Sequence, residues 1–151
     1  MTTLLAPHPF GHSMTLEQVT AQFSDKRHWE ERYRQLILLS RQLPSLDDEL
    51  KQQQVELKGC ENRVWLSCQR LPDGTLHFYG DSEGRIVKGL LAVLLSVIEG
   101  MTPQQVLAAD PMSVYQQLGI SQELSASRGN GLQALIDRSK LLAERALQNQ
   151  S

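Results

Sequence analysis

The sequence has few cysteines, few aromatic residues, little net charge and no long apolar run. Fifteen Lys and Arg against 17 Asp and Glu give a net charge of −2, which argues against nucleic acid as the main ligand because phosphate contacts need clustered cations. The most apolar stretch, residues 89–98, is far shorter than the ~20 residues of a membrane span. It predicts a buried helix and no membrane association.

The amino-terminal segment lacks the features of a secretory signal, since residues 1–11 contain no cationic start followed by an apolar run. Together with the two cysteines, this favours a cytoplasmic location with free thiols. Pro7, Pro9 and Gly11 interrupt any periodicity, so residues 1–13 are expected to form a loose arm. The remainder, residues 14–147, has the length of a single domain with its own core.

Helical patterns occupy both ends of that domain. Thr15 is expected to cap a short helix ending near Phe23, and Asp25 to cap the next, which Pro44 stops. Thr102 begins a capping box with proline at the first helical position. Further helices are expected over residues 49–54, 89–99 and 112–118, and from about Ser127 to the end of the domain.

The middle of the chain alternates with the period of a strand. Val64, Leu66 and Cys68 alternate with polar or aromatic neighbours over residues 62–69, and residues 72–74 (PDG) predict a turn into a second strand over 75–80. A short third strand is expected over 85–88. Helices, then a three-stranded antiparallel sheet, then helices indicate an α+β fold.

The two cysteines differ in their surroundings. Cys68 shares a strand face with apolar residues, which is typical of a small core residue. Cys60 follows Gly59 in a polar turn and has no apolar neighbour before Val64. If the strand continues through Cys60, eight residues separate the two Cα atoms by about 26 Å, whereas a disulfide needs about 7 Å or less.

Charges flank Cys60 with opposing effects on its thiol. Lys58 and Arg63 favour the thiolate and Glu61 opposes it, so the sequence alone does not fix the direction of a pKa shift. These charges also fit an ordinary solvated surface. A reactive and an incidental role for Cys60 both remain open at this point.

Four ordered motifs resemble the SufE family of sulfur acceptors. The cysteine motif is residues 59–66 (GCENRVWL). The other three motifs are residues 29–37 (WEERYRQLI) with 43–44 (LP), residues 78–91 (FYGDSEGRIVKGLL) and residues 124–132 (LSASRGNGL). Together the resemblance extends from about residue 8 to 142. The sequence of the cysteine motif and residues 8–11 (HPFG) are most similar to the CsdE branch of the family, whose partner is the desulfurase CsdA.

The resemblance implies a fold shared with IscU-type iron–sulfur scaffolds and a role as carrier of persulfide sulfur. Cys60 matches the family's acceptor cysteine, and Gly59, Glu61, Arg63 and Arg128 are possible supporting residues. The partner would be a CsdA-like cysteine desulfurase, which holds the pyridoxal phosphate (PLP), so no cofactor is expected here. Sulfur would pass to a downstream acceptor in iron–sulfur assembly or transfer-RNA modification.

Three other classes of protein compete with this interpretation. An IscU-type scaffold needs several cluster ligands, but the chain has only two cysteines, predicted far apart. A thiol hydrolase needs a base near its nucleophile, and no histidine lies beside Cys60 in the sequence. A desulfurase-binding module without chemistry would not need Cys60.

Overall fold

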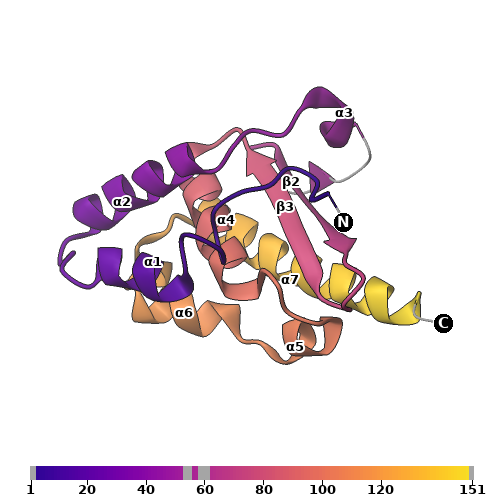
Figure 1. Cartoon of the computed structure of the whole chain (residues 1–151). Coiled ribbons are helices and arrows are strands. Elements are labelled where there is room, and N and C mark those ends of the chain that lie inside the picture. Colours follow the sequence, from indigo (N-terminus) through magenta and orange to yellow (C-terminus); the bar gives the residue numbers. More distant parts are fainter. Residues whose placement is uncertain (1–2, 53–55, 58–61, 150–151) are drawn as a thin grey trace.

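Helices precede and follow a small antiparallel sheet in the computed structural model (Figure 1), which describes residues 3–52, 56–57 and 62–149. The predicted α+β class is confirmed. Along the described chain the elements are α1 (Leu16–Phe23), α2 (Trp29–Gln42), α3 (Asp48–Lys51), β1 (Glu56–Leu57), β2 (Val64–Arg70), β3 (Leu76–Ser82), α4 (Arg85–Ile98), α5 (Pro103–Ala108), α6 (Pro111–Gln117), a 3₁₀ turn (Ser121–Glu123) and α7 (Ala126–Gln148).

The sheet has the order β1-β2-β3, and both pairings are antiparallel. Strands β2 and β3 form the predicted hairpin, but the third strand expected over residues 85–88 is wrong. Those residues begin α4, after Gly84 as its N-cap, and the third strand is β1, where Leu57 pairs with Val64. Ile86, Val87 and the apolar residues that follow are buried residues of one continuous helix. A short apolar run fits a strand and a buried helix equally well, so the pattern alone did not distinguish them.

The predicted buried helix is confirmed as α4, which starts four residues earlier than expected and forms the centre of the core. It contacts α1, α2, α7 and β3, and most of its side chains are fully buried. Gly89 lies where α4 meets α2, and a Cβ there would lie 2.3 Å from the Leu36 carbonyl oxygen. Glycine is therefore needed for the close approach of these two helices.

Helix caps agree with the sequence at two of the expected sites. Thr102 completes the predicted capping box, and Thr15, predicted only as an N-cap, also completes a capping box with Gln18. Asp25 does not cap α2, because that helix begins only at Trp29 and the Asp25 carboxylate pairs with Lys26 instead. The last helix begins at Ala126, one residue before the expected start.

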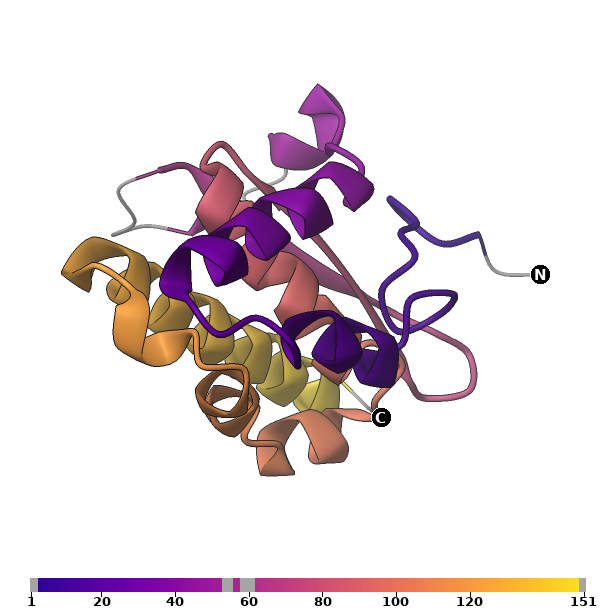
Figure 2. The ribbon, with the colours of Figure 1, turned by 90° about the vertical axis from the view of Figure 1, so that its left-hand side faces the viewer.

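The two faces of the sheet are covered differently. Val64, Leu66 and Phe78 point into the main core with the helices, and Cys68 packs against that core. Trp65 and Tyr79 point the other way, into a second cluster with residues of α3 and the amino-terminal segment. Helix α7 packs against β1 and β2, and the two views place it and the amino-terminal segment on opposite sides of the sheet (Figures 1 and 2).

The described part of the amino-terminal arm, residues 3–13, packs against the domain, in contrast to the loose arm that its prolines suggest. Phe10 is fully buried, and the Leu5 amide donates to Gln69 Oε1 at 2.8 Å. Proline and glycine exclude regular structure here, but they do not prevent irregular backbone from burying its side chains. No helix in the described ranges is long and apolar enough to cross a bilayer.

Candidate functional site

The predicted acceptor Cys60, with Gly59 and Glu61, lies outside the described residues. In the sequence, Cys60 lies between Leu57, the last residue of β1, and Asn62, the next described residue. Residues 58–61 are called the cysteine segment below. The structure therefore shows what surrounds the two ends of this segment. Both ends are held by specific contacts.

Arg63 anchors the carboxyl-terminal end of the segment. Its carbonyl oxygen accepts hydrogen bonds from the Glu83 amide at 3.0 Å and the Ser82 hydroxyl at 3.2 Å. Its guanidinium donates to Glu56 Oε1 at 2.8 and 3.2 Å, and lies 4.9 Å from the centre of the Trp65 ring. Because Glu56 is in β1 and Arg63 directly precedes β2, this exposed ion pair links the two strands that flank the segment. Arg63, predicted as a supporting residue, is thus placed as a link between those strands.

Asn62 packs against the turn that precedes α4. A Cβ on Gly84 would lie 2.5 Å from Asn62 Nδ2, so glycine at this position leaves room for the asparagine side chain. Gly84 is also the N-cap of α4. The first described residue after Cys60 is therefore held at the amino-terminal end of the central helix.

A cleft of about 400 Å³ opens beside Asn62. Its wall contains Arg128 from the first turn of α7, Arg85 from the first turn of α4 and Tyr33 from α2. Three helices that are distant in the sequence thus converge at one end of the cysteine segment. Arg128, the other predicted supporting residue among those the structure describes, lines this cleft.

Local contacts hold Arg128 in place. The Ser125 hydroxyl accepts a hydrogen bond from the Arg128 amide at 3.4 Å and caps α7. The Arg128 guanidinium lies 5.5 Å from the Tyr33 ring centre, a cation–π distance. The Tyr33 hydroxyl in turn donates to the Glu123 carbonyl oxygen at 2.6 Å. Stacking therefore fixes a positive charge in the cleft.

The charge of the cleft suits an anionic ligand. The described lining includes two arginines and no carboxylate. Nearby cations lower the pKa of a thiol and favour the nucleophilic thiolate. Sequence inspection missed Arg85, Tyr33 and Asn62 as members of this site, although all three belong to motifs of the family resemblance.

Cys68 has a different environment in the middle of β2. It is half-buried and is a free thiol, in agreement with its predicted structural role. Burial raises its pKa to about 11, although the charge of Arg138 opposes the shift. Cys68 is consequently protonated at neutral pH and is a poor nucleophile.

An α+β fold, a cysteine segment anchored at its flanks and an adjoining cationic cleft characterise the molecule. The model of the SufE family, described as an Fe-S metabolism associated domain, matches residues 17–143, and the chain belongs to this family. The chain is also 52% identical over 132 residues to "Sulfur acceptor protein CsdE" of Escherichia coli (strain K12), across 87% of this chain and 90% of that protein.

A solved structure supports the fold independently. The solution structure of a hypothetical protein from Thermus thermophilus matches with a TM-score of 0.66 and 22% identity, covering 90% of this chain and 98% of that one. At this identity the match shows the fold alone. The predicted family resemblance is confirmed by the family model and by the CsdE relative.

Proposed function

We propose that this chain is a sulfur acceptor that takes persulfide sulfur from a PLP-dependent cysteine desulfurase of the CsdA type onto Cys60. The observation that carries the proposal is the similarity to the E. coli sulfur acceptor over most of both chains. The cationic cleft beside the cysteine segment supports it from the structure.

The transfer needs one nucleophilic sulfur and no redox partner. The Cys60 thiolate attacks the terminal sulfur of the desulfurase persulfide. A new S–S bond forms on Cys60, the S–S bond of the enzyme breaks, and the desulfurase cysteine leaves as a thiolate. The number of S–S bonds is unchanged, as in thiol–disulfide exchange.

The side chains around the segment have distinct roles in this proposal. Arg128 and Arg85 supply positive charge in the cleft lined by Asn62, two residues after Cys60 in the sequence, and Arg63 links β1 to the start of β2. Gly59 and Glu61 are retained as supporting residues from the family resemblance only. The sulfur then passes to a downstream acceptor in iron–sulfur assembly or transfer-RNA modification.

Cluster assembly on this chain is the weaker alternative. An iron–sulfur scaffold needs several thiolate or comparable ligands. The sequence has two cysteines, and burial keeps the pKa of Cys68 at about 11. With Cys68 protonated, Cys60 is the one other cysteine of the sequence, and a single cysteine suits sulfur transfer better than cluster binding.

Desulfurase turnover tests the proposed function. Adding the protein to a cysteine desulfurase with cysteine and PLP is expected to increase the rate of alanine formation, because transfer removes the persulfide that blocks the next cycle. The rate is measured at several concentrations of the protein and should saturate. An unchanged rate at all concentrations would contradict the proposal.

Replacing Arg128 by glutamine is expected to slow modification of Cys60. Loss of one nearby cation raises a thiol pKa by about 1, which lowers the thiolate fraction up to about tenfold below that pKa. The rate of Cys60 alkylation by iodoacetamide, followed against pH, measures this shift directly. The matched control is Arg34→Gln, which removes an exposed charge from α2. An unshifted profile in Arg128→Gln would contradict the role given to Arg128.

A further inference from the structure

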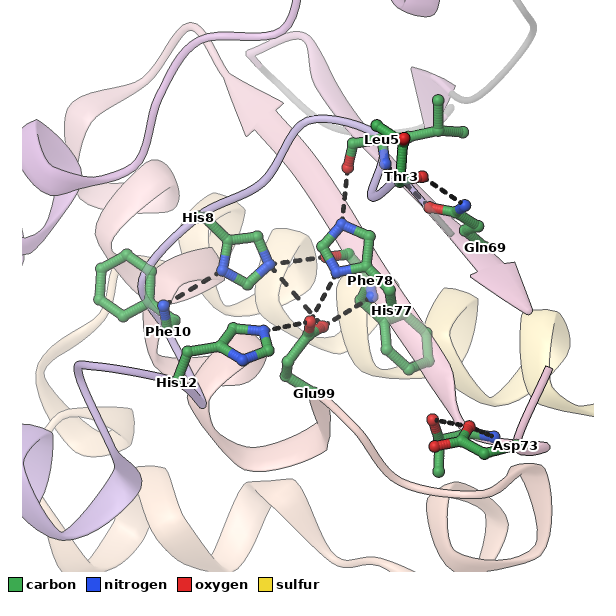
Figure 3. A network of polar contacts seen from close by, with 11 residues as sticks. Thr3, Leu5, His8, Phe10, His12, Gln69, Asp73, His77, Phe78 and Glu99 are labelled. Atoms are coloured by element: carbon green, nitrogen blue, oxygen red, sulfur yellow. Dashed lines mark hydrogen bonds and ion pairs between the residues drawn. The ribbon is translucent and has the colours of Figure 1, made fainter. Parts of the chain in front are cut away.

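A second polar cluster, drawn in Figure 3, shares no residue with the described lining of the cleft. It joins His8 and His12 of the amino-terminal arm to His77 of β3 and to Glu99, which follows α4. The Glu99 side chain is only 2% exposed. Its carboxylate accepts hydrogen bonds from His77 Nδ1 at 2.5 Å, from His12 Nε2 at 2.8 Å and from the Phe78 amide at 2.7 Å.

The hydrogen bonds of His77 require a charged imidazole. Its Nδ1 faces the Glu99 carboxylate, and its Nε2 lies 2.6 Å from the Leu5 carbonyl oxygen. Both neighbours are acceptors, so both ring nitrogens donate and His77 is an imidazolium. Burial alone would lower the pKa of His77, but the bonds to Glu99 and Leu5 outweigh burial and raise it.

The hydrogen bonds of His8 require the opposite state. Its Nε2 lies 2.7 Å from the Phe78 carbonyl oxygen and donates to it, while its Nδ1 accepts from the Phe10 amide at 3.2 Å. One nitrogen must therefore be unprotonated, and His8 is neutral. Burial lowers its pKa, although the Phe78 bond and the charge of Glu99 oppose the shift.

These contacts fasten the arm to the outer edge of the sheet. Strand β3 is the last strand of the order β1-β2-β3, and the Phe78 amide and carbonyl bond to Glu99 and His8. An edge strand with unsatisfied backbone groups can pair with other chains. The cluster satisfies this part of the edge with a carboxylate and an imidazole, and Leu5 continues the attachment through His77.

Metal binding is a competing explanation that the orientation of His8 disfavours. His8, His77 and Glu99 have potential ligand atoms within 4.8 Å of one another. A metal on His8 Nε2 would require a proton on Nδ1, and that proton would face the Phe10 amide proton. The hydrogen-bonded arrangement avoids this conflict.

We propose that the four side chains form a pH-dependent clasp that holds the amino-terminal arm on the edge of β3 and loosens when His77 loses a proton or His8 gains one. The inference does not depend on the sulfur chemistry of Cys60. Among the described residues, the titratable groups around His77 are His8, His12 and Glu99, with Tyr79 stacked on its ring.

The two limbs of the pH dependence arise from the two buried histidines. The contribution of His77 is full below its free pKa of 6.5 and is lost as the pH rises through its higher bound value. The contribution of His8 is full above 6.5 and is lost as the pH falls through its lower bound value. Glu99 adds a further loss only in stronger acid: burial alone would raise its pKa, but its hydrogen bonds lower it from 4.5.

Hydrogen exchange of the arm tests the proposal. Protection of peptides covering residues 3–14, corrected for the intrinsic exchange rate, should peak near pH 6.5. It should fall by up to about tenfold per pH unit on each side, since one proton is linked on each limb. His77→Gln should remove the fall on the alkaline side. The matched control His28→Gln changes an exposed histidine outside the cluster and should keep the profile of the unsubstituted protein.

Three results would overturn the clasp. The first is protection independent of pH between about pH 5 and 8, and the second is an alkaline fall that persists in His77→Gln. The third is an increase of protection by added zinc chloride that His77→Gln abolishes, which would identify a metal site. If His77→Gln does not fold, imidazole NMR of the unsubstituted protein decides: His77 should titrate above 6.5 and His8 below it, and the reverse order contradicts the proposal.

Discussion

Gly89→Ala is expected to lower the free energy of unfolding by about 2 kcal/mol or more, a typical cost of overpacking a core. The added methyl carbon would lie 2.3 Å from the Leu36 carbonyl oxygen and 2.7 Å from the Leu36 carbonyl carbon. Because these are backbone atoms, no side-chain rotation relieves the contact. Helices α2 and α4 would have to move apart, which loosens the packing of Leu36 and Leu39.

The direction of this effect opposes intrinsic helix propensity. Alanine is better than glycine inside a helix by about 1 kcal/mol, so only a steric conflict makes Gly89→Ala destabilising. Gly129→Ala in α7 is the matched control, because its added carbon would have no heavy atom within 4 Å. It should stabilise by about 0.5–1 kcal/mol.

Thermal unfolding measures both variants. For a chain of this size, a loss of 2 kcal/mol corresponds to a decrease in Tm of roughly 4–8 °C. Gly129→Ala should unfold slightly above the unsubstituted protein. If Gly89→Ala melts at the same temperature as Gly129→Ala, the close approach of α2 and α4 is contradicted.

Cys60→Ser is expected to abolish the stimulation of desulfurase turnover, whereas Cys68→Ser should retain it. A serine hydroxyl cannot carry persulfide sulfur. Burial raises the pKa of Cys68 to about 11, so at about pH 8 only about one molecule in a thousand has the Cys68 thiolate. Cys68 therefore cannot replace Cys60 at an appreciable rate.

The pair of cysteine variants also separates chemistry from docking. Both variants should remain folded. A thermal unfolding midpoint is measured for each variant before their activities are compared. Retention of full stimulation by Cys60→Ser would favour a binding module without chemistry. Loss of stimulation in Cys68→Ser, with the fold intact, would show that the transfer had been assigned to the wrong cysteine.

Local patterns in the sequence predicted most of the secondary structure. The capping boxes at Thr15 and Thr102 and the turn at residues 72–74 are formed by neighbouring residues, so they can be recognised without knowing the fold. Strand β1 was missed because two residues are too few to show a period. The sequence placed the third strand at residues 85–88 for a related reason, since a segment of four residues with two apolar positions, Ile86 and Val87, fits a strand and a buried helix equally well.

The candidate site was only partly predictable because it depends on tertiary contacts. Cys60 and Arg128 were selected from the sequence, but the meeting of Tyr33, Arg85 and Arg128 beside Asn62 requires three separate helices to pack together. The histidine cluster was missed for the same reason. His8 and His77 are separated by most of the first half of the chain, and Glu99 supplies the charge that connects them.

The position of the transferred sulfur tests the central claim most directly. The reduced protein is incubated with a cysteine desulfurase, cysteine and PLP, alkylated, and analysed by intact mass and peptide mapping. The account predicts a gain of one sulfur atom per chain, located on the peptide that contains Cys60. No added sulfur, or sulfur located on the peptide that contains Cys68, would contradict it.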